Sequence, residues 1–267
     1  MSKAAALLAR LAVLDSCACS DAMDQLGLAG VAPGLRALTV TRRVTGPVIT
    51  VALGPIGATG TEGRHLGTEG RNLGAAGRHL GTAGRNLGAA GRHLGTAGRH
   101  LGTAAIEAAE PGDVIVVAAG GRVDAAGWGG VLSLAAMVRG VRGVIVDGAC
   151  RDVDESATLG LPVYALAAVP ATARGRQAEV GWNTPVDVAG VRVSPGDLVV
   201  ADGSGVVFVP AGRAGDVVAA AERIAAREAA MAGRLRAGEP ASAVLSADYE
   251  DMLSGERTAR DHPGSSR

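Results

Sequence analysis

The sequence predicts an α/β domain that carries a low-complexity heptad-repeat insertion. Short runs rich in Val and Ile alternate with stretches of helical periodicity, which is the pattern of strands and helices in one layered domain. Hydrophobic residues make up 48% of the chain, but the aromatic ones are two Trp, two Tyr and one Phe. A core of Val, Leu, Ile and Ala suits strands that are buried on both faces.

The elements can be justified in chain order. Residues 3–15 place Leu and Ala at helical spacing, and Arg10 interrupts the apolar run, so an amphipathic helix fits better than a secretion signal. The phrase Pro-Gly-Asp precedes an apolar run at 111 and again at 195, which predicts a turn into a strand. Helices are predicted over 3–15, 20–26, 103–110, 129–139 and 213–232. Strands are predicted over 46–53, 114–118, 143–147, 162–166, 186–188, 191–193, 197–201 and 205–209.

Glycine and proline separate the later strands into hairpins, at Pro185, Gly190, Pro195 and Gly203. Thr103 is expected to cap the short helix before Pro111. Residues 1–256 are expected to form one domain, and the polar residues 257–267 a disordered tail.

Charge and cysteine content bound the partners and the compartment. The 26 basic and 26 acidic residues cancel, so we expect no nucleic-acid or membrane partner for the whole molecule. The three cysteines do not suggest a disulfide framework, and no apolar run reaches the ~18 residues of a membrane span. A cytoplasmic protein is predicted.

Residues 63–104 contain six copies of a seven-residue unit. Each unit has two glycines and one Leu, so a coiled coil is excluded, and 12 glycines cost a helix roughly 10 kcal/mol. Copies 63–97 are interpreted as an insertion into the domain. Six arginines and one glutamate give the repeat a net charge of +5, which leaves open a nucleic-acid arm or a His-rich metal tract. Solvated low-complexity sequence is the favoured interpretation, because no aromatic residues are interleaved for base stacking.

The candidate site lies where the apolar run 143–147 leads into Arg151-Asp152. A glycine-rich turn precedes it and opens the helix 129–139, whose unpaired N–H groups would hold a carboxylate. Asp152 is the predicted metal ligand, for Mg²⁺ or Mn²⁺, and Arg151 would bind and neutralise an α-keto acid. An ordinary charged surface turn is the alternative, since Asp154 and Glu155 follow directly. The residues predicted to bind substrate are Gly129, Gly130, Val131, Leu132 and Arg151.

Several blocks of sequence, in order, resemble the RraA-like family, which contains the 4-hydroxy-4-methyl-2-oxoglutarate/4-carboxy-4-hydroxy-2-oxoadipate aldolases. The resemblance covers most of residues 12–230 outside the insertion. It implies a compact α/β/β/α swivelling-domain fold, assembled as a homotrimer or a hexamer of two stacked trimers. The blocks are Ser20–Gly27, Gly46–Val51, Pro111–Val117, Gly129–Leu132, Asp147-Gly148 with Arg151-Asp152, and Pro195–Gly203.

The resemblance also implies residue roles. Asp152 matches the family's direct metal ligand, and an acid on the C-terminal helix reaches a neighbouring subunit's site, which makes Glu228 the catalytic candidate and Glu222 its competitor. Active aldolases of the family carry an acid where this chain has Gly130, so the general base is missing from that position. Asp124 is a nearby acid that could substitute for it.

These observations predict a divalent-metal-dependent lyase that cleaves 4-hydroxy-2-oxo diacids to release pyruvate, decarboxylates oxaloacetate, or does both. The alternative is a non-catalytic regulator that binds ribonuclease E or another protein, as some relatives do, and Gly130 favours it. The Arg151-Asp152 pair favours the enzyme.

Overall fold

The computed structural model describes residues 2–56 and 102–245. The predicted insertion at 63–97 and the predicted tail at 257–267 lie outside these residues. The helices are α1 Lys3–Leu11, α2 Ser16–Gln25, α3 Thr103–Ala108, α4 Gly130–Val138, α5 Val153–Thr158, α6 Ala214–Arg236 and α7 Ala241–Val244, with a 3-10 turn at Ala211–Arg213. The strands are β1 Val31–Ala32, β2 Arg36–Ala37, β3 Val44–Pro55, β4 Val114–Trp128, β5 Gly143–Cys150, β6 Val163–Ala168, β7 Gln177–Trp182, β8 Val186–Val188, β9 Val191–Val193, β10 Leu198–Asp202 and β11 Gly205–Val209.

One mixed sheet organises the described part of the chain, in the order β1-β11-β10-β3-β4-β5-β6-β2, with β7 also paired to β3. Strands β3, β4, β5 and β6 run parallel to one another, so their carboxyl ends meet at one edge. Strands β10, β11, β1, β2 and β7 are antiparallel to their neighbours. The predicted α/β class is confirmed.

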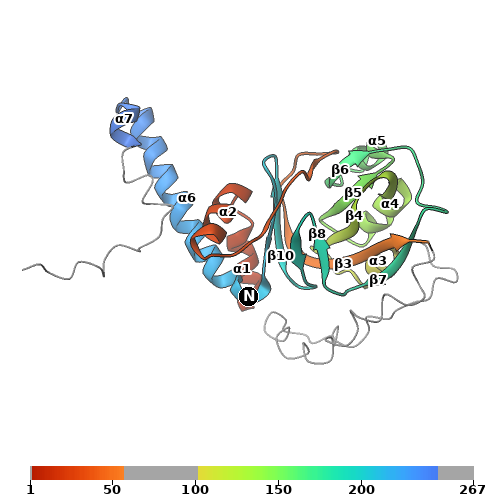
Figure 1. The fold of residues 1–267 in the computed structure, drawn as a ribbon. Helices are drawn as coiled ribbons and strands as arrows, with labels where there is room; N and C mark the ends of the chain where they lie inside the picture. The colour runs from red at the N-terminus through yellow and green to blue at the C-terminus, as the bar shows by residue number, and fades with distance from the viewer. Residues whose placement is uncertain (1, 57–101, 246–267) are drawn as a thin grey trace, which may run out of the picture.

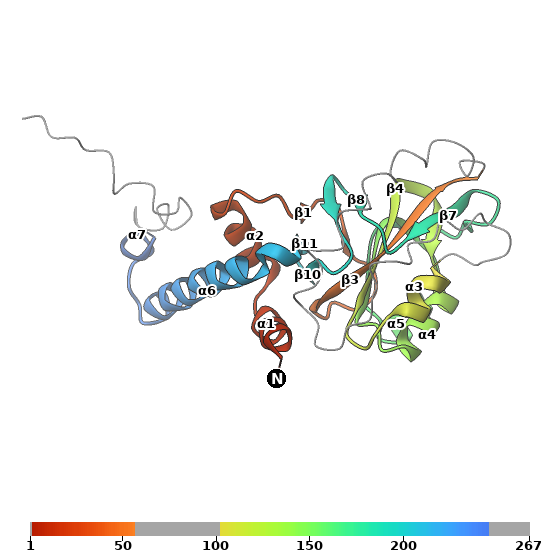
Figure 2. The ribbon, with the colours of Figure 1, turned by 90° about the horizontal axis from the view of Figure 1, so that it is seen from below.

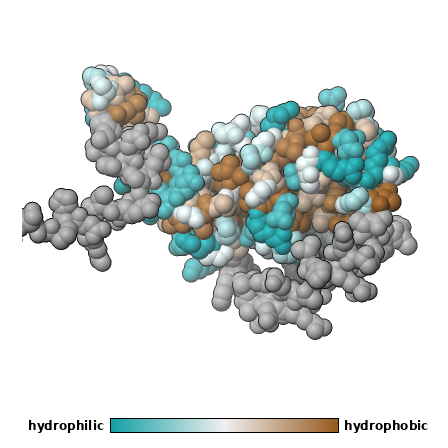
Figure 3. Space-filling view, viewed as in Figure 1, coloured by the Kyte–Doolittle hydropathy of each residue, from teal (hydrophilic) through white to brown (hydrophobic). Residues whose placement is uncertain are grey.

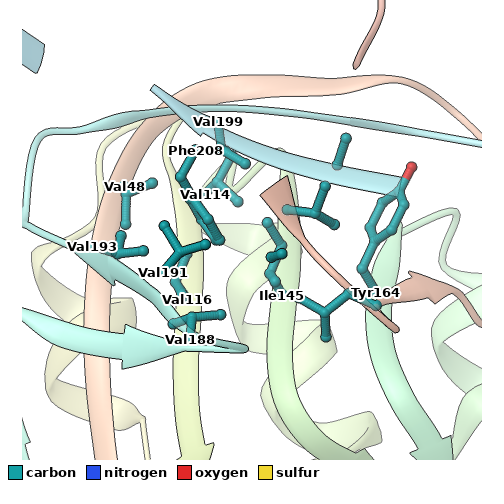
Figure 4. Close-up of a cluster of buried hydrophobic side chains, with 14 of the residues drawn as sticks. Val48, Val114, Val116, Ile145, Tyr164, Val188, Val191, Val193, Val199 and Phe208 are labelled. Atoms are coloured by element: carbon teal, nitrogen blue, oxygen red, sulfur yellow. The ribbon is translucent and has the colours of Figure 1, made fainter. Parts of the chain in front are cut away.

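The parallel strands are buried on both faces, as their apolar composition predicts. In β4, Val114 and Val116 face one core while Ile115 and Val117 face the other. The first core lies under the β8–β9 hairpin and includes Ile145, Tyr164 and Phe208 (Figure 4). The second lies under α3 and α4, which pack with α5 on one side of the sheet (Figure 2).

A third core covers the β10–β11 end of the sheet with α1, α2 and α6. Its buried residues on α6 end at Ile224, and the remainder of this 23-residue helix projects away from the sheet (Figure 1). Among the described helices, none is long and apolar enough to cross a membrane. Helix α6 lies at the opposite end of the molecule from α4 and α5 (Figure 1).

The predicted helix over 3–15 is wrong in its last residues, because α1 ends at Leu11 and a new helix begins after Asp15. The Asp15 side chain accepts a hydrogen bond from the Ala18 N–H at 2.8 Å and so caps a new helix, α2. Ser16 is fixed as well, since its N–H and hydroxyl both donate to Asp202, at 2.8 and 2.6 Å. Thr103 is not the cap of α3: Gly102 takes that position with φ 75°, and Thr103 is the first helical residue.

Candidate active site

Strand β5 delivers Arg151 and Asp152 to the carboxyl edge of the parallel strands. All eight residues of β5 are buried, and its last residue pairs with Trp128 at the end of β4. The Arg151 N–H donates to the Trp128 carbonyl at 3.0 Å, which carries the pairing one residue further. Asp152 then turns the chain into α5 with φ 54° and ψ 44°, a left-handed conformation that Asp tolerates better than most residues.

Helix α4 begins directly beside this turn. Its first residue, Gly130, donates its N–H to Oδ2 of Asp152 at 3.0 Å, so the helix N-terminus holds a carboxylate of the chain itself. Glycine at the cap eases this approach, because a Cβ on Gly129 would lie 3.0 Å from Oδ2 of Asp152 and 3.0 Å from Cγ of Arg151 and would push both side chains back slightly. Of the predicted substrate-binding residues, Val131 is exposed, while Leu132 packs into the core under the helix.

The Arg151 guanidinium lies against the Asp152 carboxylate, with Nε 3.2 Å from each of its oxygens. The hydrogen bond from Gly130 and the neighbouring Arg151 charge lower the pKa of the Asp152 carboxyl from its ordinary value. Asp152 is therefore ionised at neutral pH. Its side chain is 31% exposed, so the carboxylate remains open to solvent.

Glu155 completes the cluster, and its role was not predicted from the sequence. Its carboxylate, from the first turn of α5, lies directly over Gly130, so that a Cβ built there would collide with Oε2. The chain thus places an acid in the space that a side chain at position 130 would enter. The i,i+3 spacing from Asp152 to Glu155 would have indicated a shared face, had α5 itself been predicted.

Two other candidate acids, Asp124 and Glu222, form ion pairs with arginines away from Asp152. Asp124 is paired with Arg122 at 2.7 Å and is 63% exposed, so Glu155 is better placed than Asp124 to substitute for the acid missing at Gly130. Glu222 accepts two hydrogen bonds from Arg10, at 2.8 and 2.6 Å, and so joins α1 to α6.

Glu228 is exposed on α6, and this helix lies at the opposite end of the molecule from α5, which begins just after Asp152 (Figure 1). Partial loss of water around this exposed side chain and the nearby charges of Asp15 and Asp21 raise the pKa of its carboxyl. Glu228 could reach a site only on another copy of the chain.

The cluster fits a hard cation that keeps most of its water. Within residues 2–56 and 102–245, no group of three or more His, Cys, Asp or Glu side chains could enclose a metal ion. A single ionised, solvent-open carboxylate is instead the ligand set that Mg²⁺ accepts, because Mg²⁺ dehydrates reluctantly. Asp152 is the residue that would hold it.

Trp128 packs beneath the site and does not line it. Its side chain is 2% exposed, and its indole N–H donates to the Ser133 hydroxyl at 2.9 Å. The ring also lies against Gly102, where an added Cβ would come within 3.2 Å of it.

Known proteins are similar to this chain in sequence and in fold. Relatives provisionally named as 4-hydroxy-4-methyl-2-oxoglutarate aldolases are 35% identical over 120 residues in Halalkalibacterium halodurans and 43% identical over 103 residues in Burkholderia mallei. These alignments cover 45% and 39% of this chain, and 56% and 62% of the two relatives. The chain therefore spans about three fifths of the length of these curated relatives.

Two solved structures have the same fold. An uncharacterized protein from Pseudomonas syringae superimposes with a TM-score of 0.70 at 24% identity, covering 91% of this chain and 98% of that one. RraAS2 of Streptomyces coelicolor, described as an unusual member of the RNase ES inhibitor RraA protein family, gives 0.64 at 26% identity, covering 84% and 93%. The family model for RraA-like proteins, described as Aldolase/RraA, matches residues 16–208. The chain belongs to the RraA-like family.

Proposed function

We propose that the protein is a divalent-metal-dependent lyase that releases pyruvate from a 4-hydroxy-2-oxo diacid by retro-aldol cleavage, from oxaloacetate by decarboxylation, or from both. The observation that carries the proposal is the cluster at the N-termini of α4 and α5. An ionised Asp152, an arginine and a second acid, Glu155, meet there at the carboxyl edge of the parallel strands. The relatives provisionally named as aldolases support the same class of reaction.

Both reactions break the bond between C3 and C4 of the substrate and leave its electron pair on the enolate of pyruvate. Asp152 would hold Mg²⁺ or Mn²⁺, which supplies a Lewis acid for the developing enolate charge. Arg151 binds the keto-acid end of the substrate and neutralises the same charge. The N–H groups of Val131 and Leu132, in the first turn of α4, receive the substrate carboxylate.

Glu155 is the general base in this scheme. In the retro-aldol reaction it accepts the proton of the C4 hydroxyl, while that carbon becomes a carbonyl and leaves. In the decarboxylation the leaving group is CO₂, and no hydroxyl proton has to be removed. In both cases C3 of the enolate then takes up a proton to give pyruvate.

Assembly would complete the site. The outer face of α4 exposes Val131, Leu134 and Val138 by 80, 52 and 78%, an apolar stripe beside Asp152 that supports packing against another copy. Apolar residues are also visible on the surface over the strands in Figure 3. We propose a homotrimer or hexamer in the cytoplasm. In this assembly the Glu228 carboxylate of one copy reaches the Asp152 site of the next copy. Mixing Asp152→Asn with Glu228→Gln chains should then restore turnover that neither variant shows alone.

A substrate panel tests the function. Pyruvate release from 4-hydroxy-4-methyl-2-oxoglutarate and from oxaloacetate is measured with Mg²⁺ and with EDTA. Turnover that requires the metal supports the proposal, and equal rates with metal and with chelator would contradict it.

A regulator without catalysis is the second candidate, because position 130 lacks an acid and RraAS2 belongs to a ribonuclease-inhibitor family. It predicts no turnover on any panel substrate, together with retention of ribonuclease E by the immobilised chain.

A further inference from the structure

A chain of buried hydrogen bonds runs beneath the site from β4 to the Asp152 carbonyl. The Trp128 indole N–H donates to the Ser133 hydroxyl at 2.9 Å, and the Ser133 and Ser156 hydroxyls lie 2.7 Å apart. The Ser156 hydroxyl donates to the Asp152 carbonyl at 3.1 Å. Ser133 is 0% exposed, and Trp128 and Ser156 are each 2% exposed.

The chemistry of the groups fixes the direction of every bond in this chain. An indole N–H can only donate, so the Ser133 oxygen is its acceptor. A carbonyl oxygen can only accept, so the hydroxyl hydrogen of Ser156 is committed to Asp152. The hydrogen of Ser133 must therefore point to Ser156. Each hydroxyl donates once and accepts once, which ties β4, α4 and α5 into a single network.

The network ends on a residue whose backbone conformation costs free energy. Asp152 has φ 54° and ψ 44°, the left-handed region that a side chain with a Cβ disfavours. Two sets of bonds hold it there. The Gly130 N–H binds its carboxylate, and both the N–H and the hydroxyl of Ser156 bind its carbonyl, each at 3.1 Å. Without the hydroxyl, the carbonyl would be held by the Ser156 N–H alone, so Asp152 could relax and move its carboxylate away from the N-terminus of α4.

We propose that Ser156 and, through it, Ser133 are positioning residues that hold Asp152 in its ligating conformation. The inference rests on the proposed function, because it concerns the residue that would hold the metal. Loss of a bond that orients a metal ligand typically weakens metal affinity about 10- to 100-fold. A purely structural network would stabilise the packing of α4 on α5 and leave metal affinity unchanged.

Mn²⁺ binding by the full-length chain, followed by electron paramagnetic resonance, separates the two roles without an activity assay. Ser156→Ala should raise the Kd for Mn²⁺ about tenfold. Ser133→Ala should raise it less, since the bond from Ser156 to Asp152 survives. The matched control is Thr50→Val in β3, which removes another buried hydroxyl that donates to a backbone carbonyl, that of Thr184. Its Kd should equal that of the wild type.

Ser156→Thr keeps the hydroxyl and should bind Mn²⁺ more tightly than Ser156→Ala. Wild-type affinity in folded Ser156→Ala, or equal weakening in the Ala and Thr variants, would overturn the positioning role. If Ser156→Ala does not fold, unchanged affinity in Ser133→Ala overturns the role of Ser133, and weakened binding by folded Ser156→Thr, which keeps the hydroxyl, overturns that of Ser156. A wild-type chain that binds no Mn²⁺ would instead contradict the proposed function, and the inference with it.

Discussion

The Glu155 carboxylate lies over the α-carbon of Gly130, in the space that any side chain at position 130 would enter. Helices α4 and α5 both begin at this point, so an acid on the first turn of one covers the first residue of the other. An acid from a different element thus occupies the space of a side chain at position 130. Under the proposed function, Glu155 would supply the acid that position 130 lacks.

Replacing Glu155 by Gln removes the proton acceptor and keeps the shape of the side chain. We expect kcat for retro-aldol cleavage to fall about 10²- to 10⁴-fold, which is the usual contribution of a general base. Asp154→Asn is the matched control, because Asp154 is an exposed acid in the same turn of α5. Retro-aldol rates of the two variants, measured at saturating Mg²⁺, check the prediction. A Glu155→Gln enzyme as fast as the control would exclude Glu155 as the base.

Gly130→Ala should lower turnover without unfolding the protein. The new Cβ would collide with Oε2 of Glu155, but that atom ends a flexible side chain that can swing away from its place beside Asp152. Gly203→Ala is the control, since a Cβ there meets nothing within 4 Å. Melting temperature and turnover are measured for both. Wild-type turnover in Gly130→Ala would show that the position of Glu155 does not matter.

The buried thiols predict a loss of stability in alkali. Burial raises the pKa of Cys150 from 9.0 to about 11 and that of Cys19 to about 12. Because the folded state holds these protons more tightly, their stabilising effect is complete below about pH 9 and is lost as the pH rises through 11 to 12. Denaturant unfolding between pH 8 and 11 should therefore show a shallower decline in free energy for Cys150→Ala than for the wild type. The exposed Cys17 gives the control, because Cys17→Ala should follow the wild-type slope. Identical slopes for all three proteins would refute the assignment.

Deleting 63–97 should leave folding, assembly and turnover nearly unchanged. The deletion removes 35 residues that contain no proposed site residue. Loop closure depends on the logarithm of length, so the difference in free energy of unfolding should be on the order of 1–2 kcal/mol. Melting temperature, size-exclusion chromatography and pyruvate release compare the two chains. A deletion variant that is insoluble or fails to assemble would show that the repeat is structural.

Much of the sheet could be predicted because its signals are local. The alternation of Val114, Ile115, Val116 and Val117 between two cores follows from a fully apolar run, and the position of Arg151-Asp152 follows from the end of the next such run. What could not be predicted depends on contacts between distant segments. The break between α1 and α2 is held by Asp202, 186 residues beyond Ser16.

The missed elements have weak signals of their own. Strand β7 has the sequence Gln-Ala-Glu-Val-Gly-Trp, with one β-branched residue, and is a strand because it pairs with β3. Helix α5 has six residues, too few to show a period, and begins only because Asp152 adopts a left-handed conformation. The sequence therefore gives no sign that Glu155 belongs to the site, since its place there depends on α5.

The central claim is that Asp152 binds a divalent metal for lyase chemistry. Pyruvate release from oxaloacetate, measured for the wild type and Asp152→Ala with Mg²⁺ and with EDTA, tests it most directly. We predict turnover by the wild type with Mg²⁺ and background rates in the other three reactions. Wild-type rates that persist in EDTA, or full activity in Asp152→Ala, would contradict it.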